Sequence, residues 1–207
     1  MKKYHPKILT HKTIQHYADN PIGFWEGTKD HDVSQNIRAL LDNIQRKKPF
    51  KILDFGCGPG RDLLVFKDLG HMAFGLDGCE EFCHMATKLS NCQVFHQDFI
   101  NLDLEEDFFD GIFANASLFH VPKEKLSTLL KSLHVCLATD GILFSSNPRG
   151  HGEDFTGTRY ANFMELDEYK EIVEREGFEL IDHYYRPKGR PVEQCPWLAC
   201  IFRKVSK

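Results

Sequence analysis

Ile52-Leu53-Asp54-Phe55-Gly56-Cys57-Gly58-Pro59-Gly60-Arg61-Asp62 is the most informative segment of this 207-residue chain. Apolar residues lead into Asp54, three alternating glycines follow, and from Leu63 onward apolar residues recur at helical spacing. This order predicts a buried parallel strand, a tight turn and a helix, which together open a doubly wound α/β sheet. Ligands of such sheets bind beyond the carboxyl ends of the strands, so the glycine turn is the first candidate for a binding site.

The spacing of the glycines limits the ligands that this turn can bind. A phosphate-binding loop requires Gly-Lys followed by Ser or Thr, whereas here Gly60 is followed by Arg61. A dinucleotide fingerprint counted from Gly56 and Gly58 requires a third glycine at position 61, where arginine stands. A nicotinamide oxidoreductase is therefore a weaker alternative, and a glycine-rich turn that binds nothing is the other alternative.

Glycines at 56, 58 and 60 behind Asp54 resemble motif I of the class I S-adenosylmethionine (SAM)-dependent methyltransferases. Asp77 strengthens the resemblance because it ends the next apolar run, 21 residues after Gly56. A carboxylate at the tip of the second strand, about 20 residues after the first glycine, can accept hydrogen bonds from both hydroxyls of a ribose. The alternative role for Asp77, capping the next helix, does not explain this spacing.

Length and composition fit one domain over residues 1–207, with a cap and helix over residues 1–48 and a core over residues 49–207. The net charge of −4 argues against a nucleic-acid partner or an anionic membrane surface. Long apolar runs and a signal peptide are both missing from the sequence, so no membrane contact is expected. Seven cysteines without a Cys-x-x-Cys pair indicate no metal site and no disulfide framework, and we expect a cytoplasmic protein.

Tyr17-Ala18-Asp19-Asn20-Pro21-Ile22-Gly23-Phe24-Trp25-Glu26-Gly27-Thr28 is predicted to be a loop from its proline and glycine content, and it is rich in aromatic residues. Loops with large aromatic side chains often cover a pocket. We expect this segment to fold over bound SAM as a lid that excludes water, with Tyr17 and Trp25 in the cofactor site. A helix over residues 33–44, capped by Asp32, should follow.

The remaining pattern alternates strands and helices and then ends on two strands that have no helix between them. Two late strands of this kind should pair as an antiparallel hairpin. A polar, glycine-rich segment over residues 147–152 is too long to be a simple connector. Strands after the first are predicted near residues 72–77, 94–96, 108–114, 142–146, 178–185 and 197–202, and helices near residues 79–90, 122–137 and 166–176.

Longer strings narrow the resemblance to the C-terminal methyltransferase domain of the ovothiol-biosynthesis enzyme, 5-histidylcysteine sulfoxide synthase. The similarity extends from about Tyr17 to about Phe202. No iron-binding sulfoxide synthase portion precedes this domain, so we expect a stand-alone methyltransferase, an excised domain or a relative with a shifted substrate. Besides the glycine turn, the strings are Phe24-Trp25-Glu26-Gly27-Thr28-Lys29-Asp30-His31-Asp32-Val33-Ser34-Gln35-Asn36, Phe113-Ala114-Asn115-Ala116-Ser117-Leu118-Phe119-His120-Val121-Pro122 and Phe144-Ser145-Ser146-Asn147-Pro148-Arg149-Gly150.

The resemblance implies a Rossmann-like, seven-stranded class I methyltransferase sheet that is mostly parallel, with an antiparallel C-terminal hairpin and an N-terminal helical or loop cap. It also implies SAM as the cofactor and a small molecule as the substrate. The cofactor residues would be Gly56, Gly58 and Gly60 at the methionine and ribose, Asp77 at the ribose, Asp98 and Phe99 at the adenine, and Asn115 beneath the sulfonium.

The reaction implied is methyl transfer to a ring nitrogen of 5-thiohistidine, which gives ovothiol. His120 is the candidate for controlling which ring nitrogen carries the proton, and Arg149 for pairing with the substrate carboxylate. Ser117 and Asn147 would contact the amine and the ring. Tyr160, Tyr185 and Arg186 would form pocket walls, with ordinary strand packing as the alternative. The alternatives are a SAM methyltransferase for another thiol, amine or quinone-type metabolite, and a non-catalytic SAM-fold binding module.

Overall fold

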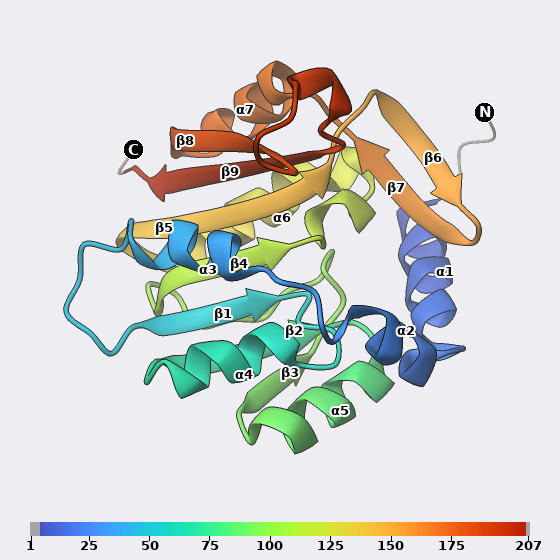
Figure 1. The fold of residues 1–207 in the computed structure, drawn as a ribbon, viewed down its shortest axis with the longest axis horizontal. Coiled ribbons are helices and arrows are strands. Elements are labelled where there is room, and N and C mark those ends of the chain that lie inside the picture. The colour runs from blue at the N-terminus through green and yellow to red at the C-terminus, as the bar shows by residue number, and fades with distance from the viewer. Residues whose placement is uncertain (1–4, 206–207) are drawn as a thin grey trace.

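The computed structural model describes residues 5–205, and Figure 1 shows a twisted seven-stranded sheet with helices on both faces. The strands of this sheet are β1 (Lys51–Phe55), β2 (Met72–Asp77), β3 (Gln93–His96), β4 (Phe109–Asn115), β5 (Leu137–Pro148), β8 (Phe178–Arg186) and β9 (Trp197–Lys204). The helices are α1 (Pro6–Ala18), α2 (Pro21–Thr28), α3 (Ser34–Leu41), α4 (Arg61–Asp68), α5 (Glu80–Ser90), α6 (Lys123–Cys136) and α7 (Leu166–Arg175), with short 3-10 turns η1 (Leu118–His120) and η2 (Val192–Gln194). Within this described part, no helix has the length and apolar character needed to cross a membrane.

The strand order in the large sheet is β3-β2-β1-β4-β5-β9-β8. β1 pairs in parallel with β2 and β4, whereas β9 runs antiparallel between β5 and β8. The order therefore reverses at β1, and doubly wound sheets bind their ligands beyond the strand ends at such a point. The predicted Rossmann-like sheet with its antiparallel C-terminal hairpin is confirmed.

Apolar side chains cover both faces of the sheet, which explains why its parallel strands are near-continuous apolar runs. On one face, α3, α4 and α5 contribute the fully buried Leu40, Phe66 and Ala86 to a single cluster. On the other face, α6 and α7 contribute the fully buried Leu130 and Val173. This packing holds the carboxyl ends of β1, β4 and β5 at one edge, where Figure 1 also places α1 and α2.

The aromatic segment near the N-terminus is helical, so the prediction of a loop over residues 17–28 was wrong. α1 continues to Ala18, and α2 begins at Pro21. Pro21 occupies the first turn of α2, where a helix does not need its missing N–H, and the Asn20 side chain accepts a hydrogen bond from the Gly23 backbone at 3.0 Å. Proline and asparagine here start a helix instead of marking a turn.

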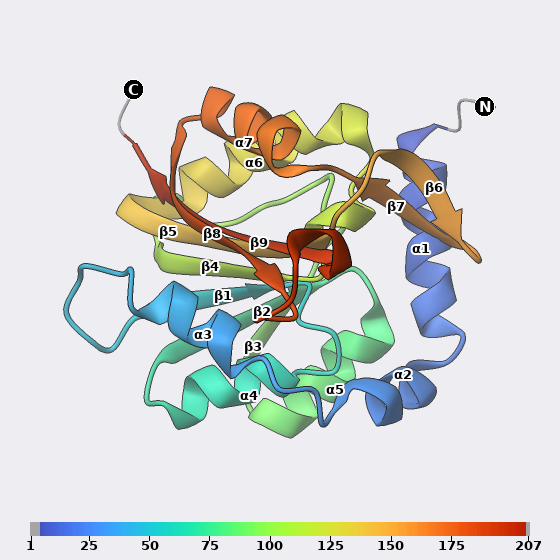
Figure 2. The same cartoon turned by 45° about the horizontal axis from the view of Figure 1, so that its top comes forward.

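A two-stranded hairpin, β6 (Gly152–Thr156) and β7 (Arg159–Phe163), was not predicted and follows β5 directly. Figures 1 and 2 agree in placing β7 beside α1, at the edge where the parallel strands end. The backbone N–H of Tyr160 in β7 donates to the Thr13 hydroxyl of α1 at 3.0 Å. The helix after α2 is also shorter than predicted, because α3 ends at Leu41.

Candidate active site

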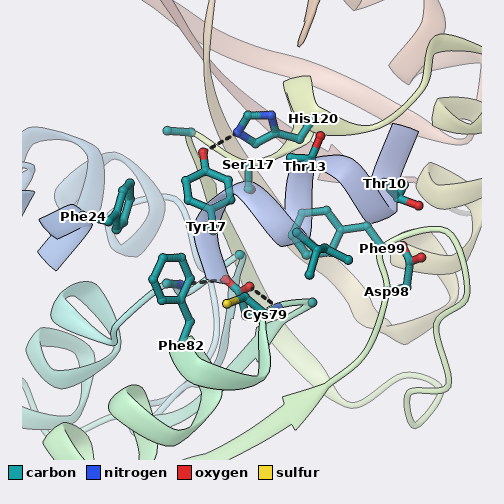
Figure 3. A pocket seen from close by; sticks show the side chains of 16 residues that line it. Thr10, Thr13, Tyr17, Phe24, Cys79, Phe82, Asp98, Phe99, Ser117 and His120 are labelled. Carbon is teal, nitrogen blue, oxygen red and sulfur yellow. Dashed lines mark hydrogen bonds between the residues drawn. The ribbon is translucent and has the colours of Figure 1, made fainter. Parts of the chain in front are cut away.

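The first cavity lies at the carboxyl ends of β1, β2 and β4, beneath α1 and α2 (Figure 3). The space between its walls, including the open mouth, is about 620 Å³. The sheet contributes the floor and the two N-terminal helices contribute the roof. Its walls are Thr10, Thr13, Ile14, Tyr17, Phe24, Gly56, Gly58, Asp77, Gly78, Cys79, Phe82, Asp98, Phe99, Ala116, Ser117 and His120.

The three glycines of the turn have different surroundings. All have positive φ, at +78° for Gly56, +52° for Gly58 and +94° for Gly60. A Cβ on Gly56 would lie 2.5 Å from the Ser117 Cβ, and one on Gly60 would lie 2.7 Å from the Ala86 Cα. A Cβ on Gly58 would meet nothing closer than the Phe24 ring at 3.6 Å. Gly56 and Gly60 are therefore required for close packing, whereas Gly58 keeps space open at the cavity wall.

Asp77 stands at the tip of β2, where the sequence predicted an acceptor. Its two carboxylate oxygens accept the backbone N–H groups of Gly58 and Cys79, each at 2.9 Å. A carboxylate has about four acceptor positions, so both oxygens keep capacity for a further donor. Burial raises the pKa of Asp77 to about 6, although hydrogen bonds from backbone N–H groups oppose this shift. Asp77 therefore orders the glycine turn and also faces the cavity.

His120 and Tyr17 form a defined hydrogen-bond chain at the roof of the cavity (Figure 3). The Nδ1 of His120 lies 2.7 Å from the Tyr160 carbonyl oxygen, which only accepts, so Nδ1 carries the proton. The Nε2 therefore accepts from the Tyr17 hydroxyl at 2.8 Å, and Arg159 donates to that hydroxyl at 3.3 Å. Burial lowers the pKa of His120 to about 4, so its ring is neutral at pH 7.

A second cavity, with a volume of about 1330 Å³, adjoins the first along the glycine turn. The two cavities share Phe24, Gly56, Gly58 and Ala116. The second cavity is more open, and it has charged side chains of both signs. Its other walls are Trp25, Thr28, His31, Asp32, Val33, Cys57, Pro59, Arg61, Asp62, Asn115, Arg186, Pro187 and Trp197.

Asn115 lies in the wall of the second cavity and is held by two partners. Its side-chain oxygen accepts from the fully buried Asn36 amide at 2.9 Å, and its amide nitrogen donates to Asp62 at 3.3 Å. Asn36 in turn accepts from the Tyr184 hydroxyl at 2.8 Å. This chain of hydrogen bonds connects β8, α3, β4 and α4, and it fixes the carboxamide of Asn115 in one orientation.

Arg61 attaches α2 to the same network. Its guanidinium donates to both carboxylate oxygens of Asp62, at 2.6 and 2.9 Å, and to the carbonyl oxygen of Thr28 at 2.7 Å. Thr28 is the last residue of α2, where a helix leaves carbonyl groups unpaired. Arg61 therefore pairs with Asp62 and also holds the end of α2 at the edge of the second cavity.

Solved methyltransferase structures have the same fold. The 1,6-didemethyltoxoflavin-N1-methyltransferase of Burkholderia thailandensis, with bound 1,6-didemethyltoxoflavin and S-adenosylhomocysteine, has a TM-score of 0.78 and 22% identity over 100% of this chain and 93% of that chain. A TehB-like SAM-dependent methyltransferase of Corynebacterium glutamicum has a TM-score of 0.71 and 21% identity over 92% of this chain and 99% of that chain. At these identities the likeness shows the fold.

The sequence carries the activity assignment. A family profile described as "Methyltransferase domain" matches residues 52–141, which include the last four residues of β1, the glycine turn, Asp77 and Asn115. An uncharacterized methyltransferase of Staphylococcus carnosus (strain TM300) is 23% identical over 160 residues, covering 76% of this chain and 77% of that protein. The chain is a SAM-dependent methyltransferase. The alternatives of a nicotinamide oxidoreductase and a non-catalytic module are set aside.

The residues of the methyltransferase fit SAM, which carries positive charge on its sulfonium and ammonium groups. The carboxyl groups of Asp77 and Asp98 line the first cavity, and those of Asp32 and Asp62 line the second. Behind the turn, Oδ2 of the buried Asp54 is an acceptor without a hydrogen-bond partner among the described residues. When bound, SAM supplies a methyl group that its sulfonium centre already activates.

Most of the sequence-predicted cofactor residues are brought together. Gly56, Gly58, Asp77, Asp98, Phe99 and Tyr17 line the first cavity, and Asn115 and Trp25 line the second. Gly60 does not line either cavity, since its role is the close contact with α5. Phe24 also lines both cavities and belongs to the segment 17–28 that was expected to cover the cofactor. Thr10 and Thr13 of α1 and Phe82 of α5 were missed, because no local sequence pattern shows which helix face packs over the cavity.

The predicted substrate residues are dispersed. Ser117 and His120 both line the first cavity. The Ser117 hydroxyl donates to the Phe55 carbonyl at 2.7 Å. Three others are absent from the walls of both cavities as far as residues 5–205 define them. These are Asn147, Tyr160 and Arg149. Asn147 accepts the Phe119 N–H at 3.2 Å, the Tyr160 hydroxyl donates to Glu153, and Arg149 donates to Glu165.

The described residues also contain no cluster of three or more His, Cys, Asp or Glu side chains suited to a metal ion.

Gly58→Ala is expected to remain folded while losing SAM affinity. The protein has room for the added methyl group, and alanine adopts the left-handed region at a cost of about 1–2 kcal/mol. The methyl group would occupy space at the seam of the two cavities, so affinity for S-adenosylhomocysteine should fall roughly tenfold or more by calorimetry. Gly189→Ala is the matched control, because Gly189 has φ +82° and open space around it. Equal affinities in the two variants would mean that the turn does not contact the cofactor.

Proposed function

We propose that the enzyme methylates a ring nitrogen of a small imidazole acceptor, and that 5-thiohistidine is this acceptor. The observation that carries the proposal is the seam between the two cavities. Both cavities are lined by Gly56, Gly58 and Ala116, so a cofactor in the first and an acceptor in the second approach each other there. Asn115 lies next to this seam in a fixed orientation.

Two similarities support a ring nitrogen of a small molecule. The strings around Trp25, Asn115 and Asn147 resemble the methyltransferase domain of the ovothiol enzyme. A protein of the same fold is named as the N1-methyltransferase of 1,6-didemethyltoxoflavin, which is a small molecule. The second cavity also lacks the basic groove that a nucleic acid would need, since Asp32 and Asp62 offset its arginines.

The residues of the site need to supply alignment more than acid–base chemistry. A neutral imidazole nitrogen has a free lone pair, so the residues of the site would not need to remove a proton before the methyl group moves from SAM to that nitrogen and S-adenosylhomocysteine is left. Holding the two reactants in line contributes roughly 7–11 kcal/mol to lowering the barrier. The Asn115 carboxamide is held by Asn36 and Asp62, so it is prepared to orient the acceptor without rearrangement. His120 serves through Tyr17, which it holds at the roof of the first cavity.

A panel of acceptors tests the proposal. With SAM, the protein should methylate 5-thiohistidine once, at the ring nitrogen next to the carbon that bears the side chain. Histidine lacks the sulfur and should be a much poorer acceptor, and simple thiols, amines and quinols should be poorer still. Mass spectrometry gives the number of methyl groups and NMR gives their position. Methylation on sulfur, or equal use of histidine, would contradict this acceptor and leave the SAM-dependent activity in place.

A further inference from the structure

The wall of the second cavity at the end of the sheet consists of a cation and an aromatic ring side by side. Arg186 ends β8 and Trp197 begins β9, and the two are direct partners in the antiparallel register. Partners in such a pair place their side chains on the same face of the sheet. Both residues line the cavity, and Trp197 also makes an edge contact with Phe119 at 6.5 Å between ring centroids.

Arg186 differs from the other arginines near the site in its lack of protein partners. Arg61 is bound by Asp62 and by the Thr28 carbonyl, and Arg149 is bound by Glu165 and by the Val192 carbonyl. Arg186 is half-buried, yet within residues 5–205 its guanidinium makes neither an ion pair nor a side-chain hydrogen bond. A guanidinium offers five donors in a planar fork that matches a carboxylate. Arg186 therefore contributes to the cavity wall a guanidinium whose donors are free to bind an anion.

Asp32 provides a negative charge on the same cavity. One of its carboxylate oxygens accepts the Ser34 N–H at 2.9 Å, just before α3. This hydrogen bond is the main reason why the pKa of Asp32 is lowered, and Arg38 and Arg186 also contribute. Asp32 and Arg186 interact electrostatically but form no ion pair with each other in the described structure. The walls of the second cavity thus contain both an anion, Asp32, and a cation, Arg186.

We propose that Arg186 binds the carboxylate of the acceptor and Asp32 its ammonium group, with the ring of the acceptor against Trp197, so that the second cavity selects amino acids with a planar side chain. This inference deepens the proposed function and rests on it for the placement of the cofactor in the first cavity and of the acceptor in the second. It moves carboxylate recognition from Arg149, the candidate from sequence, to Arg186. The main competing ligand is the carboxylate of the cofactor's own methionine portion.

Arg186→Gln tests this assignment against Arg190→Gln, since Arg190 is exposed, lies in the following loop and lines neither cavity. We expect Arg186→Gln to raise KM for 5-thiohistidine roughly 30-fold or more, because the partner carboxylate is left unpaired. KM for the decarboxylated analogue, 5-thiohistamine, should be unchanged, and kcat at saturation should change little. Arg186→Lys should restore part of the affinity, because it keeps the charge without the planar fork.

Two further measurements separate acceptor recognition from cofactor binding. Calorimetry with S-adenosylhomocysteine should give the same affinity for wild type, Arg186→Gln and Arg190→Gln. Asp32→Asn keeps an oxygen for the Ser34 N–H but removes the charge, so it should raise KM for 5-thiohistidine and not for its deaminated analogue. Loss of S-adenosylhomocysteine affinity in Arg186→Gln would assign Arg186 to the cofactor and overturn the inference.

The outcome for the acceptor itself is distinguishable from the outcome for Arg186. If 5-thiohistidine is not methylated but another aromatic amino acid is, and its KM depends on Arg186, the proposed acceptor is wrong and this inference stands. The inference is overturned if the enzyme uses only acceptors without a carboxylate. It is also overturned if no aromatic amino acid in the panel is methylated or bound by the protein loaded with S-adenosylhomocysteine.

Discussion

Asp77→Ala is expected to weaken SAM binding by roughly 1–3 kcal/mol, the usual effect of losing hydrogen bonds to a charged group. The carboxylate stands at the tip of β2 in the first cavity, where one oxygen accepts the Gly58 N–H of the glycine turn and the other accepts the Cys79 N–H just before α5. The substitution therefore removes the expected ribose acceptor, one support of the glycine turn and one support of the start of α5. Calorimetry with S-adenosylhomocysteine measures the loss. Asp98→Ala is the comparison, because the Asp98 carboxylate lines the same cavity but, among residues 5–205, accepts only the local Ile100 N–H, at 3.2 Å.

The same residue predicts opposite effects of pH on binding and on stability. Burial raises the pKa of Asp77 from 3.8 to about 6 in the folded protein. Because the folded value exceeds the unfolded one, the stability that Asp77 contributes is fully present below about pH 4 and is lost as the pH rises through about 6. SAM affinity should change in the other direction and fall below about pH 6, since the protonated carboxyl accepts fewer hydrogen bonds.

Asp77→Asn separates these effects from other titrating groups. Urea unfolding and calorimetry with S-adenosylhomocysteine should be carried out for both proteins between pH 4 and 8, roughly the range over which the folded and unfolded carboxyl groups titrate. The differences between wild type and Asp77→Asn in free energy of unfolding and in affinity should show the two opposite pH dependences. A binding difference that does not vary with pH would show that the charge of Asp77 is not used to hold the cofactor.

Gly60→Ala should reduce the free energy of unfolding by about 2–5 kcal/mol, the largest effect on stability that we expect. Gly60 has φ +94°, and an added Cβ would lie 2.7 Å from the Ala86 Cα and 2.9 Å from its Cβ, both on α5. The Ala86 Cα belongs to the backbone of α5, so it cannot move away from the added methyl group as the end of a flexible side chain would. The loss therefore combines left-handed strain with an overpacked contact between α4 and α5.

Gly70→Ala isolates the strain from the contact. Gly70 has a similar φ of +83°, but a Cβ there would meet nothing within 4 Å. We expect a loss of only about 1–2 kcal/mol in urea unfolding, the strain of the left-handed conformation alone. If the two variants were equally destabilised, the close approach of Gly60 to α5 would have no energetic significance.

The sheet was predictable because each strand carries its own signal. Buried parallel strands such as β1 and β4 are apolar on both faces, and each ends at a polar residue or a glycine turn. The positions of Asp77, Asp98 and Asn115 on the cavity walls were predictable for the same reason, since strand ends in such a sheet meet at one edge. The local pattern thus predicts the floor of the first cavity.

Residues 17–28 were expected to cover the cofactor pocket, but their helical structure and the specificity of the second cavity were not predictable in this way. α1 and α2 contain proline, glycine and several polar residues, and their position depends on contacts with β7 and α5. Arg149 and Arg186 both stand near strand ends, and their sequence neighbours do not show which one the fold pairs internally. Glu165 decides which arginine is paired within the protein. It lies 16 positions after Arg149 in the sequence, and its carboxylate accepts a hydrogen bond from Arg149 at 2.9 Å.

The contact between α1 and β7 has a consequence for the order in which the cavity forms during synthesis. Thr13 and Tyr17 are hydrogen-bonded to Tyr160 and Arg159, across sequence separations of 147 and 142 residues. At ribosomal rates of about 5–20 residues per second, roughly 7–30 s pass between the emergence of α1 and that of its docking strand. The glycine turn and Asp77 need only β1 and β2, which lie close in the sequence. The floor of the first cavity is therefore assembled early on the ribosome, while the helices that cover it stay exposed to solvent until most of the chain has been made.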